Sequence, residues 1–216
     1  NVESGRREHG MLPSSIANAQ DYPDFTRGAI VHQQNYDESL LLGPLAAATD
    51  REQYTLEFAM HWDKKLPTTT WNYGYMAFGR SHDGPLGIAG KFRGASEDGC
   101  YVLALRPGAK VRDEHGKYRT GDLAQLIRLD GGPGASREGK VLHTMNLKKP
   151  IKPNESIEGK IVVKGKYFYF VINGQYSAQI HDSAYRGPYV HFGRYHGNAT
   201  GGPLVLTRAL ARESWA

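Results

Sequence analysis

The chain contains a single cysteine, and this scarcity excludes several classes of protein at once. Cys100 alone can form neither an intramolecular disulfide nor a multi-cysteine metal site. Zinc ribbons, iron–sulfur proteins and disulfide scaffolds are therefore excluded. The sequence also lacks any run of about eighteen uncharged apolar residues, so it predicts no transmembrane helix and no membrane partner.

Motifs of several enzyme classes are missing as well. There is no Gly-x-Ser-x-Gly segment of the kind that places a hydrolase nucleophile. The glycine-rich run at residues 131–134 lacks the Gly-Lys-Ser/Thr ending of a phosphate-binding loop. A strand with the Glu-x-Asp-x-x-Glu pattern, which would supply the two carboxylates of a sandwich glycosidase, is also absent.

Turn residues and aromatic residues are abundant. Among 216 residues there are 26 glycines and 13 tyrosines, a composition that favours an all-β sandwich or barrel with many tight turns. The 27 Lys and Arg exceed the 22 Asp and Glu, giving a net charge of +5 that suits an anionic partner. Because these cations are spread along the chain without an RNA-binding aromatic motif, we expect an anionic polysaccharide and no nucleic acid.

Short segments of alternating apolar and polar residues recur between glycines and prolines. They lie at residues 51–62, 72–79, 99–105, 121–129, 140–147, 158–172, 175–181, 189–196 and 203–209, and the first forty residues add a strand or two. A total of about ten to fourteen strands predicts an antiparallel two-sheet β-sandwich. No repeat or linker interrupts the pattern, so we expect one domain over residues 1–216.

The clearest local signal is a hairpin closed by the Asn-Gly pair at residues 173–174. A two-residue turn places Phe168 and Phe170 on one face with Gln175, Gln179 and His181. That combination of flat rings and hydrogen-bonding groups suits a sugar-binding groove. We expect the other face to enter the core, and it carries Tyr167, Tyr169, Val171, Tyr176, Ala178 and Ile180. The alternative, in which both faces are buried, stays open.

A second informative segment runs from residue 187 to residue 197. Alternation places Tyr189, His191, Gly193 and Tyr195 on one face, with Arg194 on the other. The glycine would let a ligand approach the strand closely. A phenol and an imidazole within reach of one carbon atom form a plausible acid–base pair.

This segment resembles the penultimate-strand signature of the jelly-roll polysaccharide lyases, the group of alginate, glucuronan and heparin lyases. The resemblance rests on Tyr189-x-His191-x-Gly193-x-Tyr195 and the preceding Gly-Pro pair. The aromatic hairpin and residues 58–67, which end in Leu-Pro, also resemble the glucuronan-lyase-like group. The resemblance implies a concanavalin-A-like jelly roll that cleaves a uronate-containing polysaccharide by β-elimination.

The resemblance also implies roles for individual residues. Tyr195 matches the catalytic tyrosine of the family, and His191 replaces its usual lysine. An unperturbed phenol titrates near ~10, so Tyr195 needs a cationic neighbour such as His191, Arg194 or another arginine. Residues 179–181 spell the family's Gln-Ile-His motif, which implies a catalytic role for His181 and substrate binding for Gln179. The further candidates for holding the substrate carboxylate are Arg6, Gln33, Gln34 and His61.

Two other functions stay open at this point, a non-catalytic lectin-like sandwich and a glycoside hydrolase on the same fold. The sequons at Asn154 and Asn198 permit glycosylation, and together with the implied family they lead us to expect a secreted protein. We expect a monomer that requires no cofactor, although loop aspartates such as Asp50 and Asp130 would suit a structural calcium ion.

Overall fold

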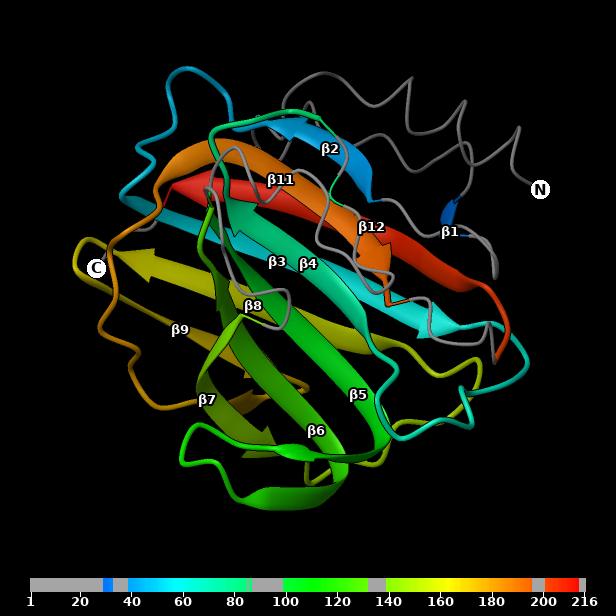
Figure 1. Ribbon diagram of the computed structural model, residues 1–216. Coiled ribbons are helices and arrows are strands. Elements are labelled where there is room, and N and C mark those ends of the chain that lie inside the picture. Colours follow the sequence, from blue (N-terminus) through cyan, green and yellow to red (C-terminus); the bar gives the residue numbers. More distant parts are fainter. Residues whose placement is uncertain are drawn as a thin grey trace.

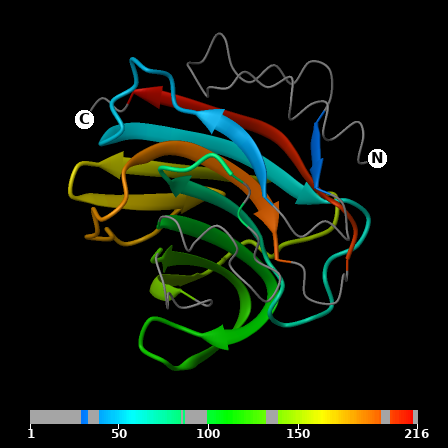
Figure 2. The ribbon, with the colours of Figure 1, turned by 45° about the horizontal axis from the view of Figure 1, so that its top comes forward.

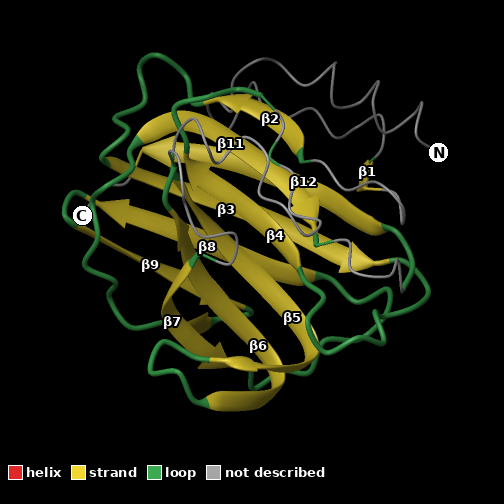
Figure 3. Cartoon of the chain, viewed as in Figure 1, coloured by secondary structure: helices red, strands yellow, loops and turns green. Residues whose placement is uncertain are grey.

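The computed structural model describes residues 29–32, 39–84, 86, 99–131, 139–195 and 201–213, and all the regular elements in these ranges are β-strands (Figure 1, Figure 3). The candidate residues Arg6, Gln33 and Gln34 lie outside the described residues. Within these ranges no helix is long and apolar enough to cross a membrane.

The described strands form two antiparallel sheets, as the alternation predicts. The first sheet has the strand order β1-β12-β3-β8-β9-β10, and its strands are Ile30–His32, Leu204–Glu213, Gln53–Trp62, Ile157–Lys164, Tyr167–Ile172 and Gln175–Tyr176. The second has the order β2-β11-β4-β5-β6-β7, with strands Leu40–Pro44, Gly187–Arg194, Gly74–Gly79, Cys100–Arg112, Tyr118–Leu129 and Lys140–Asn146. Figure 2 shows the two sheets as stacked layers, and the all-β sandwich fold is confirmed.

The core lies between the sheets and is built by period-two alternation. On β3, alternate residues from Tyr54 to Trp62 point inward and are buried, while Glu57 and His61 lie on the outer face. On the second sheet, Val190 and Phe192 of β11 enter the same core. The predicted strand positions are thus largely confirmed, with boundaries that shift by a few residues.

The predicted faces of the β9–β10 hairpin are inverted. Phe168, Phe170 and Ile172 belong to the buried core, whereas Tyr169 and Tyr176 lie on the outer face, where their rings stack 6.1 Å apart. The prediction of Phe168 and Phe170 as groove residues is therefore wrong. The reason is that β9 pairs with β8, whose core residues Ile161 and Val163 lie opposite Phe170 and Phe168.

Two further features of this region differ from the expectation. Residues 158–172 form two strands and not one, because the chain turns at Gly165, which has a positive φ of 65°. Beyond the Asn-Gly turn the register slips, so that Phe168 pairs with Ile180 and not with Gln179.

The segment between β10 and β11 is fastened to the second sheet by a polar network around Asp182. Its carboxylate accepts hydrogen bonds from the Tyr101 hydroxyl and from Arg128, whose Nη1 lies 2.7 Å from Oδ2. Asp130 contacts the Arg128 guanidinium at 3.1 Å and accepts a bond of 2.5 Å from the Tyr185 hydroxyl. We call these five residues the Asp182 network.

The outer face of the second sheet carries a second buried hydrophobic cluster. Alternate residues of β4, β5 and β6 contribute to it, together with Leu86 and the residue before β4: Tyr73, Tyr75, Ala77, Cys100, Val102, Ala104, Ile127 and Leu129. Tyr195 packs against this cluster from the end of β11. Apolar side chains therefore cover much of this face, and the buried Gln125 lies among them, opposite Ala104.

Candidate functional site

The predicted alternation of β11 is confirmed. Val190 and Phe192 lie in the core between the sheets, and His191 and Tyr195 lie on the outer side of the second sheet. Tyr189 lies on the same outer side and is half-buried. Its backbone forms an isolated antiparallel β-bridge with Arg80. The structure thus brings three of the predicted residues to one strand face, but it does not bring their side chains to one point.

His191 is fully buried and held by neighbouring polar groups. Its Nδ1 lies 3.0 Å from the Ser39 hydroxyl oxygen, which also accepts a 2.7 Å bond from the backbone N–H of Leu86. Which of Ser39 and His191 donates depends on the tautomer of the imidazole ring. On the other side of the ring, Nε2 lies 3.5 Å from Arg80, which is also completely buried. His191 therefore positions Ser39 and the segment at Leu86.

The residue between His191 and Tyr195 does not leave room for a ligand. A Cβ atom added at Gly193 would lie 2.4 Å from the Tyr75 hydroxyl, so the Tyr75 ring fills the place that was expected to admit a sugar. Four strand residues separate the Cα atoms of His191 and Tyr195 by about 13 Å. That this phenol and this imidazole act on the same carbon atom stays a prediction.

Tyr195 itself belongs to a compact aromatic and cationic group. Its ring stacks on that of Tyr73 at 5.3 Å with an interplanar angle of 19°, and its backbone N–H donates to the Tyr73 carbonyl. The Arg106 guanidinium lies over the Tyr73 ring, 4.3 Å from its centroid, and donates a 3.0 Å hydrogen bond to the backbone carbonyl of Trp71. We call Trp71, Tyr73, Arg106 and Tyr195 the Tyr195 cluster.

Exposure differs among these four residues in a way that suits ligand contact. Trp71 is 43% exposed and Tyr195 is half-buried, whereas Tyr73 and Arg106 are buried. Burial raises the pKa of the Tyr73 hydroxyl, so this ring stays neutral at physiological pH. Burial also lowers the pKa of Arg106, but a guanidinium keeps its charge in proteins. The cluster therefore combines two accessible rings, those of Trp71 and Tyr195, with one buried cation.

Other predicted residues lie elsewhere in the sandwich. The Arg194 side chain is buried and donates a 2.6 Å bond to the Gly202 carbonyl, and burial lowers its pKa to about 10. His61 is on the outer face of the first sheet, on β3. Gln179 and His181 are exposed beside β9, where the His181 ring lies 5.6 Å from Tyr167. The structure therefore does not bring these four residues to Tyr195.

Trp71, Tyr73 and Arg106 were missed by the sequence reasoning, although a signal for two of them exists. Tyr73 continues the alternation of Tyr75 and Ala77, and Arg106 continues that of Val102 and Ala104, so each pattern predicts a shared face. The pairing of β4 with β5, which brings the two patterns together, is visible only in the structure. Across the part of the chain that is described, no three His, Cys, Asp or Glu side chains gather to hold a metal ion.

No family model and no curated protein matches the chain, but solved structures resemble it. The carbohydrate recognition domain of Emp47p has a TM-score of 0.50 at 10% identity, covering 87% of this chain and 84% of that chain. A fructosyltransferase from A. japonicus has a TM-score of 0.50 at 9% identity, covering 87% of this chain and 26% of that chain. Alginate lyase A1-II′, a member of polysaccharide lyase family 7, has a TM-score of 0.48 at 13% identity, covering 91% of this chain and 84% of that chain.

The two structures with TM-scores of 0.50 support the fold. A jelly-roll sandwich is confirmed, and these two neighbours are a carbohydrate recognition domain and a fructosyltransferase. The fold is thus one that carbohydrate-active proteins use. Because the same sandwich hosts binding proteins and enzymes, activity must be argued from the side chains.

Proposed function

We propose that this protein binds an acidic carbohydrate at the Tyr195 cluster. The observation that carries the proposal is the Arg106 guanidinium, buried and 4.3 Å above a tyrosine ring that stacks on Tyr195. Trp71, whose backbone carbonyl accepts a hydrogen bond from the same arginine, is 43% exposed. One chain supplies all four residues, so the proposal requires no second copy.

Each part of the cluster suits one part of an acidic sugar. The apolar C–H face of a pyranose ring packs on an aromatic side chain, and the two accessible rings are Trp71 and Tyr195. A guanidinium forms charge-assisted hydrogen bonds to a carboxylate. Because Arg106 is held by the Trp71 carbonyl and by the ring of Tyr73, little side-chain freedom would be lost on binding.

Calorimetric titration with uronate oligosaccharides tests this proposal. We expect Arg106→Gln to weaken binding about tenfold or more, because a hydrogen bond to a charged group contributes about 1.5–3 kcal/mol. Trp71→Ala should weaken binding of acidic and neutral sugars alike. Equal affinity of the parent protein and both variants would contradict the proposal.

The chain offers a matched control for this experiment. Arg112 lies 4.4 Å over the ring of Tyr118, which is 60% exposed, and this pair sits at the far end of the β5–β6 hairpin. It has the same chemistry as the pair in the Tyr195 cluster. We expect Tyr118→Ala to leave the affinity unchanged.

A second candidate function is β-elimination at the same site, with Tyr195 as the proton-transferring residue. The observation that favours it is the position of Arg106, whose guanidinium lies over the Tyr73 ring on which Tyr195 stacks. The tyrosine oxygen would take the proton from the carbon next to the carboxylate. The electron pair left behind would form a carbon–carbon double bond as the bond to the glycosidic oxygen breaks, and the tyrosine would then give the proton to that oxygen. His191 has no role in this scheme, because its side chain is fully buried.

Tyr195→Phe separates the two functions, because it keeps the ring and removes only the hydroxyl group. A lyase would release an unsaturated sugar that absorbs in the ultraviolet, and this signal should vanish in the variant while binding persists. An absence of product from alginate, glucuronan, heparinoid and pectic substrates would rule out a lyase on those polymers. An extracellular location, where such polymers occur, is part of the same proposal.

A further inference from the structure

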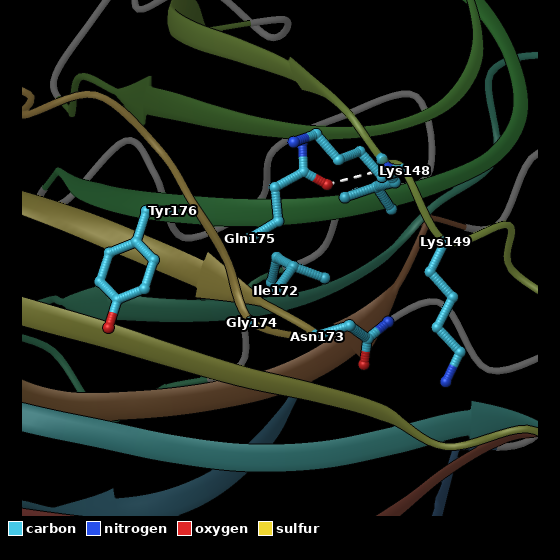
Figure 4. A pocket seen from close by; sticks show the side chains of 8 residues that line it. Lys148, Lys149, Ile172, Asn173, Gly174, Gln175 and Tyr176 are labelled. Atoms are coloured by element: carbon cyan, nitrogen blue, oxygen red, sulfur yellow. Dashed lines mark hydrogen bonds between the residues drawn. The ribbon is translucent and has the colours of Figure 1, made fainter.

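A polar groove lies at the edge of the sandwich, away from the Tyr195 cluster. It is bounded by the connection that follows β7 and by the turn between β9 and β10, and it encloses about 370 Å³ (Figure 4). That volume is at the lower end of the range of small-molecule sites, and a single sugar residue fits it. Its lining residues are Leu147, Lys148, Lys149, Ile172, Asn173, Gly174, Gln175 and Tyr176.

The walls of this groove are fixed by hydrogen bonds. The Gln175 side chain accepts from the Lys148 backbone N–H at 2.8 Å and donates to the Asn146 carbonyl at 2.7 Å, so it ties the two walls together. Asn173 and Gly174 adopt the positive φ values of a tight turn, 47° and 78°. The Asn173 side chain accepts from the Glu158 backbone N–H at 3.0 Å. The groove is therefore formed before any ligand arrives.

The charge of the groove is positive. Its eight lining residues include two lysines and no carboxylate. Lys149 forms an ion pair of 3.2 Å with Glu155, in which both side chains are partly exposed, and Lys148 is exposed at the rim. Figure 4 shows the Lys149 side chain extending from the wall opposite Tyr176. An anionic group in the groove would thus meet ammonium groups that water already reaches.

A row of aromatic rings leads away from the groove along the outer face of the first sheet. Tyr176 is 69% exposed and stacks on Tyr169 with an interplanar angle of 26°. Tyr167 lies two residues along β9 on the same face, about 7 Å away, and contacts the His181 ring. We call the rings of Tyr167, Tyr169, Tyr176 and His181 the edge strip.

We propose that the groove and the edge strip form a second binding site for an acidic oligosaccharide, with one acidic sugar in the groove and its neighbours stacked on Tyr176 and Tyr169. The class of ligand follows from the proposed function, whereas the site itself is carried by the groove, its lysines and the exposed rings. The edge strip and the Tyr195 cluster lie on opposite outer faces of the sandwich. A long polymer held at one site would therefore meet the second at a raised effective concentration.

Nuclear magnetic resonance titration with a short acidic oligosaccharide, such as a uronate tetrasaccharide, tests this inference. We expect backbone amide shifts at residues 147–149 and 172–176, separate from those around Tyr195. Lys148→Gln combined with Lys149→Gln should weaken binding at the groove about two- to thirtyfold, since exposed charge pairs contribute about 0.2–1 kcal/mol each. Tyr176→Ala should abolish the groove shifts. Lys152→Gln, which changes an exposed lysine outside the groove lining, is the matched control.

The outcomes separate this inference from the proposed function. Groove shifts that persist in Arg106→Gln support an independent second site. Shifts confined to the Tyr195 cluster overturn the second site and leave the proposed function intact. Shifts at the groove alone overturn the proposed site at the Tyr195 cluster and support the edge strip. Equal shifts in Lys152→Gln and in the double lysine variant show only non-specific attraction, and they overturn the inference.

Discussion

Gly193 shows how a residue without a side chain positions a neighbouring ring. The Tyr75 ring lies over it so closely that a Cβ atom would approach the hydroxyl oxygen to 2.4 Å and the adjoining ring carbon to 2.6 Å. We expect Gly193→Ala to lower the free energy of unfolding by about 1–3 kcal/mol, the usual cost of overpacking. Urea denaturation followed by fluorescence would measure this loss.

A double-variant comparison identifies the cause of that loss. If the Tyr75 ring is responsible, Gly193→Ala and Tyr75→Ala together should cost less than the sum of the two single changes. Additive costs would show that the strain arises in the β11 backbone instead.

The outer-face position of Tyr195 could be predicted from alternation alone, whereas the burial of His191 could not. Alternation states which side of a strand a residue occupies, but not whether other parts of the chain cover that side. His191 is covered through contacts with Ser39, which is 152 residues away, and with Arg80, which is 111 residues away. Nothing near His191 in the sequence indicates these partners.

At the scale of elements, the sequence predicts in part which face of the β9–β10 hairpin is buried. The inward face of β9 carries phenylalanines and the outward face carries tyrosines, whose hydroxyl groups favour contact with water. The neighbouring β8 strengthens the signal, because Lys160 lies directly opposite Val171 and Lys164 opposite Tyr167. Reading residues 158–172 as one strand concealed this pairing, and recognition of the turn at Gly165 would have corrected it.

The Asp182 network predicts an acid limit to stability. Although partial burial by itself raises the pKa of Asp182, the bonds from Tyr101, Ala184 and Arg128 outweigh it, and the pKa is lowered below 3.8. A lowered folded-state pKa stabilises the fold above the unfolded value, and this contribution is lost as the pH falls through the folded value. As the pH falls below about 4, we expect the melting temperature of Asp182→Asn to decrease less than that of the parent protein. Asp83→Asn, at an exposed position, should follow the parent curve.

The Asp182 network also predicts that the fold loses stability at alkaline pH. Burial and the bond to Asp182 raise the pKa of Tyr101 to about 12, and burial and the bond to Asp130 raise that of Tyr185 to about 12. A raised pKa of an acid favours the neutral form in the folded state, so this stability is present below the ordinary value near 10 and is lost as the pH rises towards 12. Tyr185→Phe should flatten the alkaline decline of the melting temperature, and an unchanged decline would contradict this assignment.

At the scale of the whole molecule, the pairing of strands is strongly non-local. Strand β12 lies between β1 and β3, and β11 lies between β2 and β4, so both sheets join the two ends of the described chain. The long stretches of chain between these paired strands must close into loops before the strands can pair. Sandwiches of this kind therefore fold in about milliseconds to seconds. Stopped-flow refolding should show this range, and a microsecond phase that recovers the full native signal would contradict it.

This topology also marks the limit of prediction from the sequence. Alternation and turn residues predict strands and their number, because these depend on neighbours a few residues apart. The order of the strands in each sheet depends on side-chain packing between distant segments, and the Tyr195 cluster arises from that order, since it joins β5 to residues beside β4 and β11.

The one thiol of the chain, finally, provides a built-in measurement of how often the outer face of the second sheet opens. Cys100 is 1% exposed, at the start of β5 within the second hydrophobic cluster, so a labelling reagent can reach it only when that cluster separates. Under conditions of rapid reclosing, the labelling rate divided by that of a free thiol gives the population of the open form, and hence the free energy of local opening. A ligand that binds only the closed form at the Tyr195 cluster would slow this reaction in proportion to its occupancy, so the labelling rate of the chain's own thiol reports the affinity.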